Sequence, residues 1–163
     1  MPAVLSEELV AFAQSGVVIH VATADPRMRP ETARAMGARV EPGGAEVTVF
    51  VPRASIGANE ANLAAAGRIA AVFVRPLDDV SFQLKGTVVA MGDAAERDRA
   101  LVDRYVDLLV EQFLVVGIPA RITRAIARWP ALAVRFRVEQ VFVQTPGPGA
   151  GAVLGPPSAG SGA

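Results

Sequence analysis

The fold is decided by one stretch, residues 29–86, which contains RPETARAMGARV (29–40), EVTVFVP (46–52), ANEANLAAAGRIAAVFVRP (58–76) and SFQLKG (81–86). Apolar and β-branched residues in these pieces predict strands over Thr32–Val40, Glu46–Val51, Arg68–Val74 and Ser81–Met91. The small residues of Asn59–Ala66, closed by Gly67, predict a short helix. The order is therefore strand, strand, helix, strand, strand.

The flanking segments extend this pattern at both ends. A helix capped by Ser6 and a buried strand over Val17–Thr23 are expected before the stretch. After it, a capping box formed by Asp93 and Glu96 predicts a long helix, and a second helix is expected over Ala120–Trp129. The alternating residues of Ala133–Val143 predict a last strand. We therefore expect a mainly β protein with helices: a six-stranded antiparallel β-barrel with a short helix after the third strand and two late helices.

The composition excludes several classes of protein. The chain has 163 residues, no cysteine, one histidine, and 16 basic against 16 acidic residues. These numbers argue against disulfides, thiol chemistry, a protein-ligated metal site and a nucleic-acid partner. Charged residues interrupt the apolar segment 101–118, and no signal peptide is apparent, so we expect no membrane span and a cytoplasmic location.

We expect one domain over residues 1–144, followed by a flexible tail over residues 145–163 that is rich in proline and glycine. Apolar residues make up 52% of the chain, which suggests that some apolar surface is buried between subunits.

Arginines mark the first candidate binding site. Arg34 and Arg39 stand near the ends of the second predicted strand, where a guanidinium fork suits a phosphate. The alternative is two solvated arginines. Arg53 precedes the short helix, and Asn59 at its start is either a ligand contact or the N-cap.

Other polar residues have equally open roles. Ser81, Gln83 and Lys85 share one face of the fifth predicted strand, and they either contact a flat ligand or face solvent. His20 lies in an apolar strand with no acidic neighbour, and a packed or partly exposed histidine is favoured over a catalytic base. A group of late arginines either faces solvent, binds an anion or contributes to a subunit interface. Its members are Arg121, Arg124, Arg128, Arg135 and Arg137.

The chain resembles the pyridoxamine 5′-phosphate oxidase-like proteins, the FMN-binding split-barrel group. The residues that carry the resemblance are Arg29-Pro30, TARAMGARV (32–40), TVFVP (48–52), ANLAAAGRIAAVF (61–73) and SFQLKGTV (81–88). They cover about the first ninety residues, and the later predicted elements agree in order. The fold this implies is a six-stranded antiparallel split β-barrel.

The resemblance also implies a homodimer with two FMN sites at its interface, and a small-molecule substrate. Arg34 and Arg39 match the group's pattern of an arginine, four residues, and a lysine or arginine that contacts FMN. The same comparison assigns Pro52, Arg53 and Gln83 to the cofactor, with Asn59 and Ser81 as further candidates. A deazaflavin is the alternative cofactor.

The chain departs from the group where the short helix begins. Ala58 and Asn59 occupy the place of a basic pair, and each lost contact of ~1.5–3 kcal/mol weakens FMN binding by one to two orders of magnitude. Elements that bind substrate in the oxidase itself are also missing, so we do not expect that activity. Two functions remain: a flavin-dependent oxidoreductase, or a non-catalytic dimeric binding protein for a flavin, deazaflavin, pyridoxal phosphate or haem.

Overall fold

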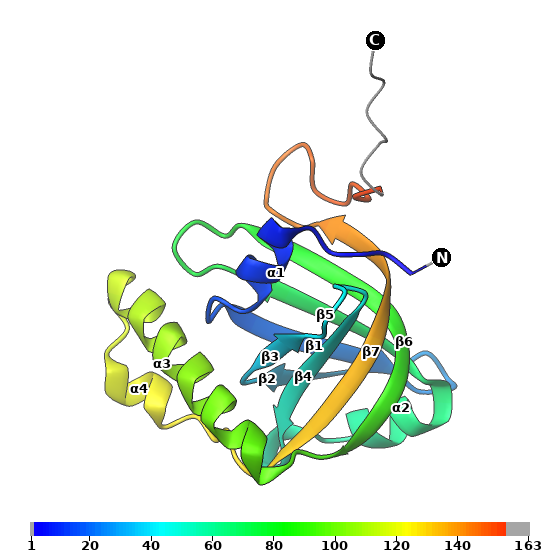
Figure 1. The fold of residues 1–163 in the computed structure, drawn as a ribbon, viewed down its shortest axis with the longest axis horizontal. Helices are drawn as coiled ribbons and strands as arrows, with labels where there is room; N and C mark the ends of the chain where they lie inside the picture. The colour runs from blue at the N-terminus through cyan, green and yellow to red at the C-terminus, as the bar shows by residue number, and fades with distance from the viewer. Residues whose placement is uncertain (1, 156–163) are drawn as a thin grey trace.

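A single curled antiparallel sheet forms a half-barrel in the computed structural model, which describes residues 2–155 (Figure 1). Its strand order is β2-β1-β5-β6-β7-β4-β3. The strands are β1 (Val18–Ala24), β2 (Pro30–Ala35), β3 (Ala38–Val40), β4 (Glu46–Pro52), β5 (Arg68–Val74), β6 (Ser81–Asp93) and β7 (Ala131–Val143). The mainly β class with helices is confirmed.

The prediction of six strands is wrong, because the expected strand over Thr32–Val40 is two strands. The chain changes partner at Met36 and Gly37: β2 pairs with β1, whereas β3 pairs with β4. Met36 is fully buried in a cluster with residues of helix α3 (Arg99–Val115). Its amide donates to the carbonyl of Phe50 at 2.8 Å, which joins the two halves of the sheet. Burial of one side chain therefore breaks the strand.

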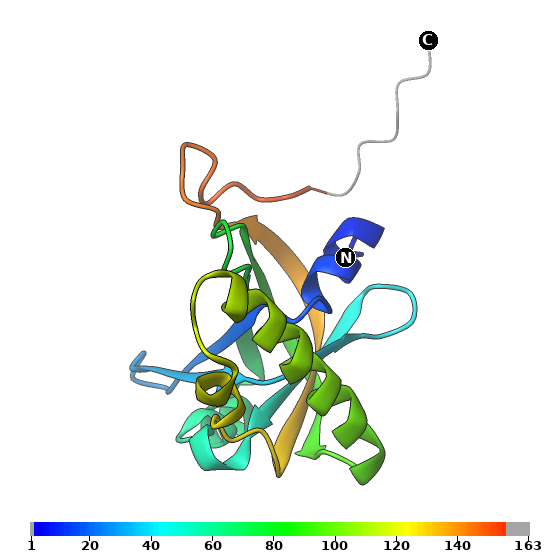
Figure 2. The same cartoon turned by 90° about the vertical axis from the view of Figure 1, so that its left-hand side faces the viewer.

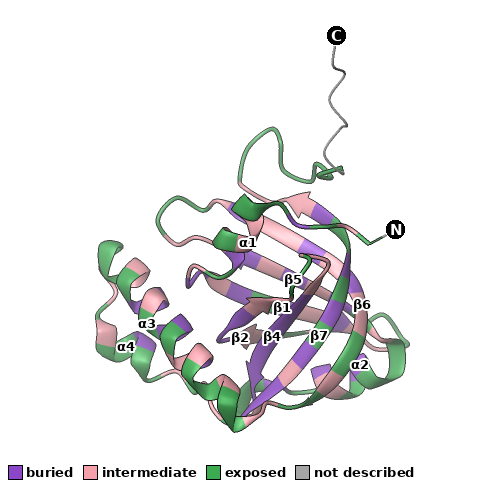
Figure 3. Cartoon of the chain, in the orientation of Figure 1, coloured by how far each residue is buried: buried purple, intermediate pink, exposed green. Residues whose placement is uncertain are grey.

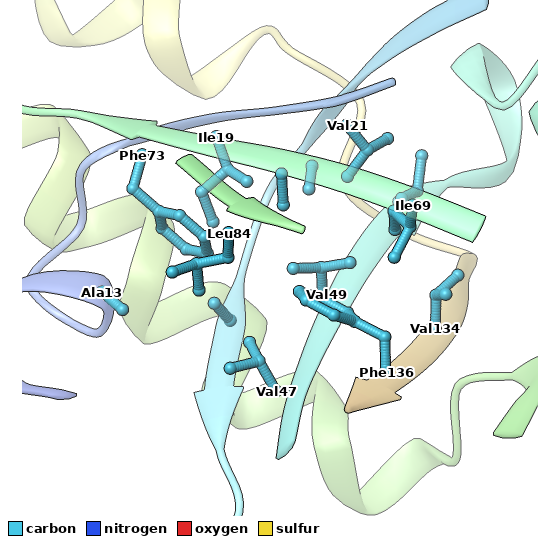
Figure 4. Close-up of a cluster of buried hydrophobic side chains, with 14 of the residues drawn as sticks. Ala13, Ile19, Val21, Val47, Val49, Ile69, Phe73, Leu84, Val134 and Phe136 are labelled. Atoms are coloured by element: carbon cyan, nitrogen blue, oxygen red, sulfur yellow. The ribbon is translucent and has the colours of Figure 1, made fainter. Parts of the chain in front are cut away.

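The core lies inside the curl of the sheet, where alternate residues of every strand meet. Figure 3 shows the resulting alternation of buried and exposed positions along the strands, and Figure 4 shows the side chains in contact. Members drawn in the close-up include Ile19, Val21, Val49, Ile69, Phe73, Leu84, Val134 and Phe136. Residues between these positions lie on the outer face of the sheet, because successive side chains of a strand point to opposite sides.

Helices cover two parts of this half-barrel. Helix α1 (Glu7–Ala13) and helix α2 (Asn59–Ala66) lie against the strands, while α3 and α4 (Ala120–Arg124) lie together on another side, seen in front of the strands in Figure 2. Phe50 of β4 packs against Val102 of α3, so α3 covers the outer face there. Short 3₁₀ turns occupy Arg53–Ser55 and Glu96–Asp98.

Two details of the late helices differ from expectation. Asp93 does not cap a helix: it is the last residue of β6, and α3 begins at Arg99 after a 3₁₀ turn. The expected helix over Ala120–Trp129 ends at Arg124. Beyond that point Ile126 and Trp129 pack against two separate apolar clusters that include residues of α3, and the chain between them is irregular.

The segment after β7 lies against the sheet for its first part. The amide of Gly151 donates to the carbonyl of Val143 at 2.7 Å, and the amide of Leu154 donates to the carbonyl of Val141 at 2.8 Å. Residues 151–154 thus pair with the end of β7, and residues 156–163 of the expected tail lie outside the described residues.

Candidate functional site

A row of side chains crosses the outer face of four adjacent strands. Arg34 on β2 is opposite His20 on β1, His20 is opposite Val72 on β5, and Val72 is opposite Gln83 on β6. Neighbouring strands are spaced by about 4.8 Å, so roughly 14 Å separates the backbones at the two ends of the row. In the adjacent row Ala22 is opposite Ala70. Both side chains are small, so little side-chain volume covers the backbone there. We define the outer row as Arg34, His20, Val72 and Gln83.

Arg34 is the most unusual residue of the outer row. Its guanidinium is 5.6 Å from the centre of the Phe113 ring, at the end of α3. Its Nε and Nη2 atoms are buried and donate to no acceptor within the described residues. Burial lowers the pKa of this guanidinium, which is the effect expected of a cation that has lost water without gaining a carboxylate. Buried donors of this kind fit an incoming oxyanion or carbonyl oxygen.

Gln83 and Ser81 share the outer face of β6, as the sequence predicted. Ser81 pairs with Val74 and is buried, and Gln83 is half-buried at the other end of the outer row from Arg34. Lys85, the next residue on this face, has its ammonium 4.7 Å from the centre of the Phe142 ring. The structure therefore brings Arg34, Ser81 and Gln83 to one face, with His20 between them.

Arg39 lies elsewhere. Its Nε donates to Glu41 at 3.1 Å and its Nη1 donates to Asp98 at 2.8 Å. Partial burial opposes the charge, but these hydrogen bonds outweigh it and raise the pKa of Arg39. Asp98 and Phe113 stand at opposite ends of α3, roughly 20 Å apart along its axis. Arg34 and Arg39 therefore do not converge on one group within this chain.

The surroundings of Arg39 form a shallow cleft of about 210 Å³ between the ends of β4, β6 and β7. Thr48, on the floor of this cleft, donates from Oγ1 to Glu41 at 2.6 Å. Carboxylates thus surround the guanidinium, which makes this cleft less suited than the outer row to an anion.

Pro52 is the last residue of β4, and Arg53 and Asn59 follow that strand. Arg53 donates to Asp93 at 2.9 Å and to Glu60 at 2.6 Å, and these two carboxylates raise its pKa. Asn59 is fully buried: its Oδ1 accepts from the Thr23 hydroxyl and its Nδ2 donates to the carbonyl of Ile56, both at 2.9 Å. Both residues are engaged inside the chain, and Asn59 fastens α2 to β1.

Four of the five late arginines lie within ion-pair distance of a carboxylate, and one of these, Arg135, also lines the cleft beside Arg39. Arg124 donates to Asp107 at 2.7 Å and Arg128 donates to Asp103 at 2.6 Å, which ties the α4 region to α3. Arg137 donates to Glu46 at 3.1 Å across β4 and β7. These contacts support the solvated, structural interpretation of that group.

Sequence reasoning favoured a packed or partly exposed His20 over a catalytic one, and the structure places it exposed in the middle of the outer row. The alternation of Ile19, His20 and Val21 could have indicated that it faces away from the core. Its pairing with Arg34 could not be read from sequence, because the strand register is fixed only in the fold.

Among residues 2–155, no three or more His, Asp or Glu side chains gather closely enough to hold a metal ion. No helix there has the length and apolarity that crossing a bilayer demands.

Comparison with known proteins gives a fold but no close relative. No family model matches the sequence, and no curated protein matches it significantly. Among solved structures, a Lactobacillus delbrueckii protein provisionally named a pyridoxamine 5′-phosphate oxidase is similar, with a TM-score of 0.54 and 13% identity over 85% of this chain and 93% of that one.

Two other structures are similar to the same degree. An F420 reductase matches with a TM-score of 0.54 and 13% identity, covering 84% of this chain and 98% of its own. An FMN-binding protein from Syntrophomonas wolfei matches with a TM-score of 0.50 and 14% identity, covering 82% and 84%. At these identities the likeness concerns the fold, and it confirms the resemblance to the oxidase-like split-barrel proteins at that level.

Proposed function

We propose that this chain is a flavin-binding protein of the pyridoxamine 5′-phosphate oxidase-like family, and that it uses FMN to oxidise or reduce a small molecule. Support comes from the fold that it shares with proteins named for FMN and F420. The observation that carries the proposal is Arg34, whose guanidinium has two buried nitrogens that donate to no acceptor within the described residues. A phosphate or a ring carbonyl oxygen would satisfy both nitrogens.

The predicted site residues fit FMN unequally. Arg34, Ser81 and Gln83 are on one face and are proposed to hold the cofactor. Arg53 and Asn59 are already engaged by carboxylates, Thr23 and a backbone carbonyl, and Arg39 is held by Glu41 and Asp98. For these three residues, and for Pro52 beside them, a cofactor contact requires a rearrangement or a second subunit. We therefore propose that Arg34 contributes the main charge contact.

When bound, a flavin supplies hydride-transfer chemistry, and the protein supplies binding and orientation. In this chain Arg34 would neutralise negative charge, Gln83 would offer an amide donor and acceptor, and the alanines of the adjacent row, Ala22 and Ala70, would let a flat group approach the sheet. None of these roles requires the protein to transfer a proton.

Fluorescence titration of FMN tests the proposal. The wild-type protein is expected to quench FMN and to retain its absorption through gel filtration. Arg34→Ala removes a charge-assisted hydrogen bond of ~1.5–3 kcal/mol, so we expect binding to weaken by roughly 10- to 150-fold. Arg104→Ala removes an exposed arginine of α3 and serves as the matched control.

The result that would overturn the proposal is absence of binding of FMN and of F420 at tens of micromolar. Tighter binding of F420 than of FMN would select the deazaflavin alternative. Binding without reduction by NADH or NADPH under air or nitrogen would favour a flavin-binding protein without turnover.

We further propose that the chain works as a homodimer. Three consecutive apolar residues, Leu114, Val115 and Val116, are exposed at the end of α3. Exposed apolar patches of this kind are typical of interfaces. A second copy could also bring to the outer row the contacts that Arg53 and Asn59 do not provide.

A further inference from the structure

His20 occupies the centre of the outer row, next to the residue that carries the proposed function. Its neighbours along β1, Ile19 and Val21, belong to the core, so the imidazole lies on the opposite face. It is exposed and directly opposite Arg34 on β2. The other neighbour in register, Val72 on β5, offers it no hydrogen bond.

The charges around His20 are of one sign. Arg34 is the nearest, and Lys85 lies on β6, two strands away. Between them β5 presents Ala70, Val72 and Val74, and the Arg68 at its start is already paired with Glu139 on β7. Helix α3 contributes the uncharged Phe113 beside Arg34, and α2 packs against β1 from the core side through Thr23. The outer faces of β1, β2 and β5 thus present no carboxylate beside the imidazole.

This setting makes His20 neutral at pH 7. Two causes lower the pKa of its imidazole below the usual 6.5: partial desolvation by the surrounding strands, which is the larger cause, and the positive charge of Arg34. A neutral imidazole beside an unpartnered guanidinium is an incomplete anion site: an arriving anion would offset the repulsion that disfavours the second cation.

We propose that His20 binds the same phosphate of the cofactor as Arg34, and that it takes up a proton as the phosphate arrives. The inference rests on the proposed function, since it assigns a second residue to the FMN site. It assigns a role in binding to the single histidine of the chain. It also predicts that cofactor affinity depends on pH.

The sign of the pH dependence follows from linkage. The phosphate raises the pKa of His20, so the bound protein holds more protons than the free protein. Affinity is therefore lowest above the bound-state pKa, rises as the pH falls through the window between the two pKa values, and levels off below the free-state pKa. Each unit of difference between the two pKa values corresponds to roughly a tenfold change in affinity.

The first experiment follows the imidazole itself by NMR in untagged protein, where one histidine gives one signal. We expect a titration midpoint below 6.5 in the free protein, and a rise of that midpoint when FMN is added. Riboflavin, which lacks the phosphate, is the matched ligand and should leave the midpoint in place. In Arg34→Gln the free midpoint should move upward, because the neighbouring charge is gone.

The second experiment compares FMN affinity at about pH 5.5 and about pH 8. The phosphate itself titrates at about pH 6, so each affinity is compared with that of His20→Gln at the same pH. The ratio of wild-type to His20→Gln affinity should be larger at the lower pH, and His20→Lys should bind more tightly than His20→Gln at both because its charge is permanent. If the wild type binds FMN but the midpoint does not move and His20→Gln keeps the same pH profile, the role of His20 is refuted while the flavin proposal stands. If the wild type binds no FMN, both proposals fail.

Discussion

At the scale of single residues, Gly86 of β6 occupies a position where no larger residue fits. An added Cβ would lie 1.9 Å from the carbonyl oxygen of Arg137 and 2.9 Å from its carbonyl carbon, both backbone atoms of the neighbouring strand β7. The register between these strands shifts at Lys85 and Gly86, which brings the two backbones together. A β-bulge at a glycine is a common device of this kind.

We predict that Gly86→Ala lowers the free energy of unfolding by about 1–3 kcal/mol, because the strands must separate to admit a methyl group. Gly92, in the same strand, has no heavy atom within 4 Å of the same Cβ position and provides the control. Urea denaturation of the two alanine variants measures the difference. Equal midpoints would show that the close approach carries no energetic weight.

Residues differ in how far their role could be read from sequence. Arg34 could be placed because Ala33 and Ala35 mark the core side of its strand, and the arginine must face the other way. The structural role of Asn59 could not be read from sequence, because its partner Thr23 lies 36 positions earlier and contacts it only in the folded chain. The ion pair of Arg39 with Asp98 could not be read from sequence for the same reason, because the two residues are 59 positions apart.

At the scale of elements, helix α2 is fastened to β1 by a chain of three polar side chains. Thr23 donates to Asn59 at 2.9 Å and accepts from Asn62 at 3.0 Å, and all three residues are buried. A buried polar group that loses its partner costs about 1–3 kcal/mol. This contact therefore contributes substantially to the position of α2.

We expect Asn59→Ala and Thr23→Val each to lower the free energy of unfolding by about 1–3 kcal/mol. The double variant should cost less than the sum, since both changes remove the same hydrogen bond. Chemical denaturation of the four proteins in this cycle measures the coupling. Strict additivity would mean that the two side chains act independently.

Elements with a strong local signal were predicted well. The helix Asn59–Ala66 and the strand Arg68–Val74 have the expected bounds, since Gly67 separates a run of small residues from a run of β-branched ones. The break at Met36 was missed because it depends on burial against α3, some seventy residues later in the chain. The early end of α4 likewise depends on contacts of Ile126 and Trp129 that local sequence does not reveal.

At the scale of the whole molecule, the proposed homodimer makes a simple prediction about mass. Light scattering during gel filtration should report about twice the 17.0 kDa of one chain at micromolar concentration. Dilution should not reduce this mass if the interface is obligate. A constant mass near that of one chain would contradict the dimer, without bearing on the outer row.

The position of β7 also governs the order in which the molecule can be assembled. This last strand lies between β6 and β4, and β4 has no other neighbour apart from its hairpin partner β3. On a growing polypeptide, the hairpins β1–β2, β3–β4 and β5–β6 can form early, but the sheet cannot close until residues 131–143 are made. Contacts between distant segments slow folding, so closure should come only after residues 131–143 have been made. Until then β4 and β6 expose unpaired edges, and the nascent protein is most vulnerable to aggregation in that interval.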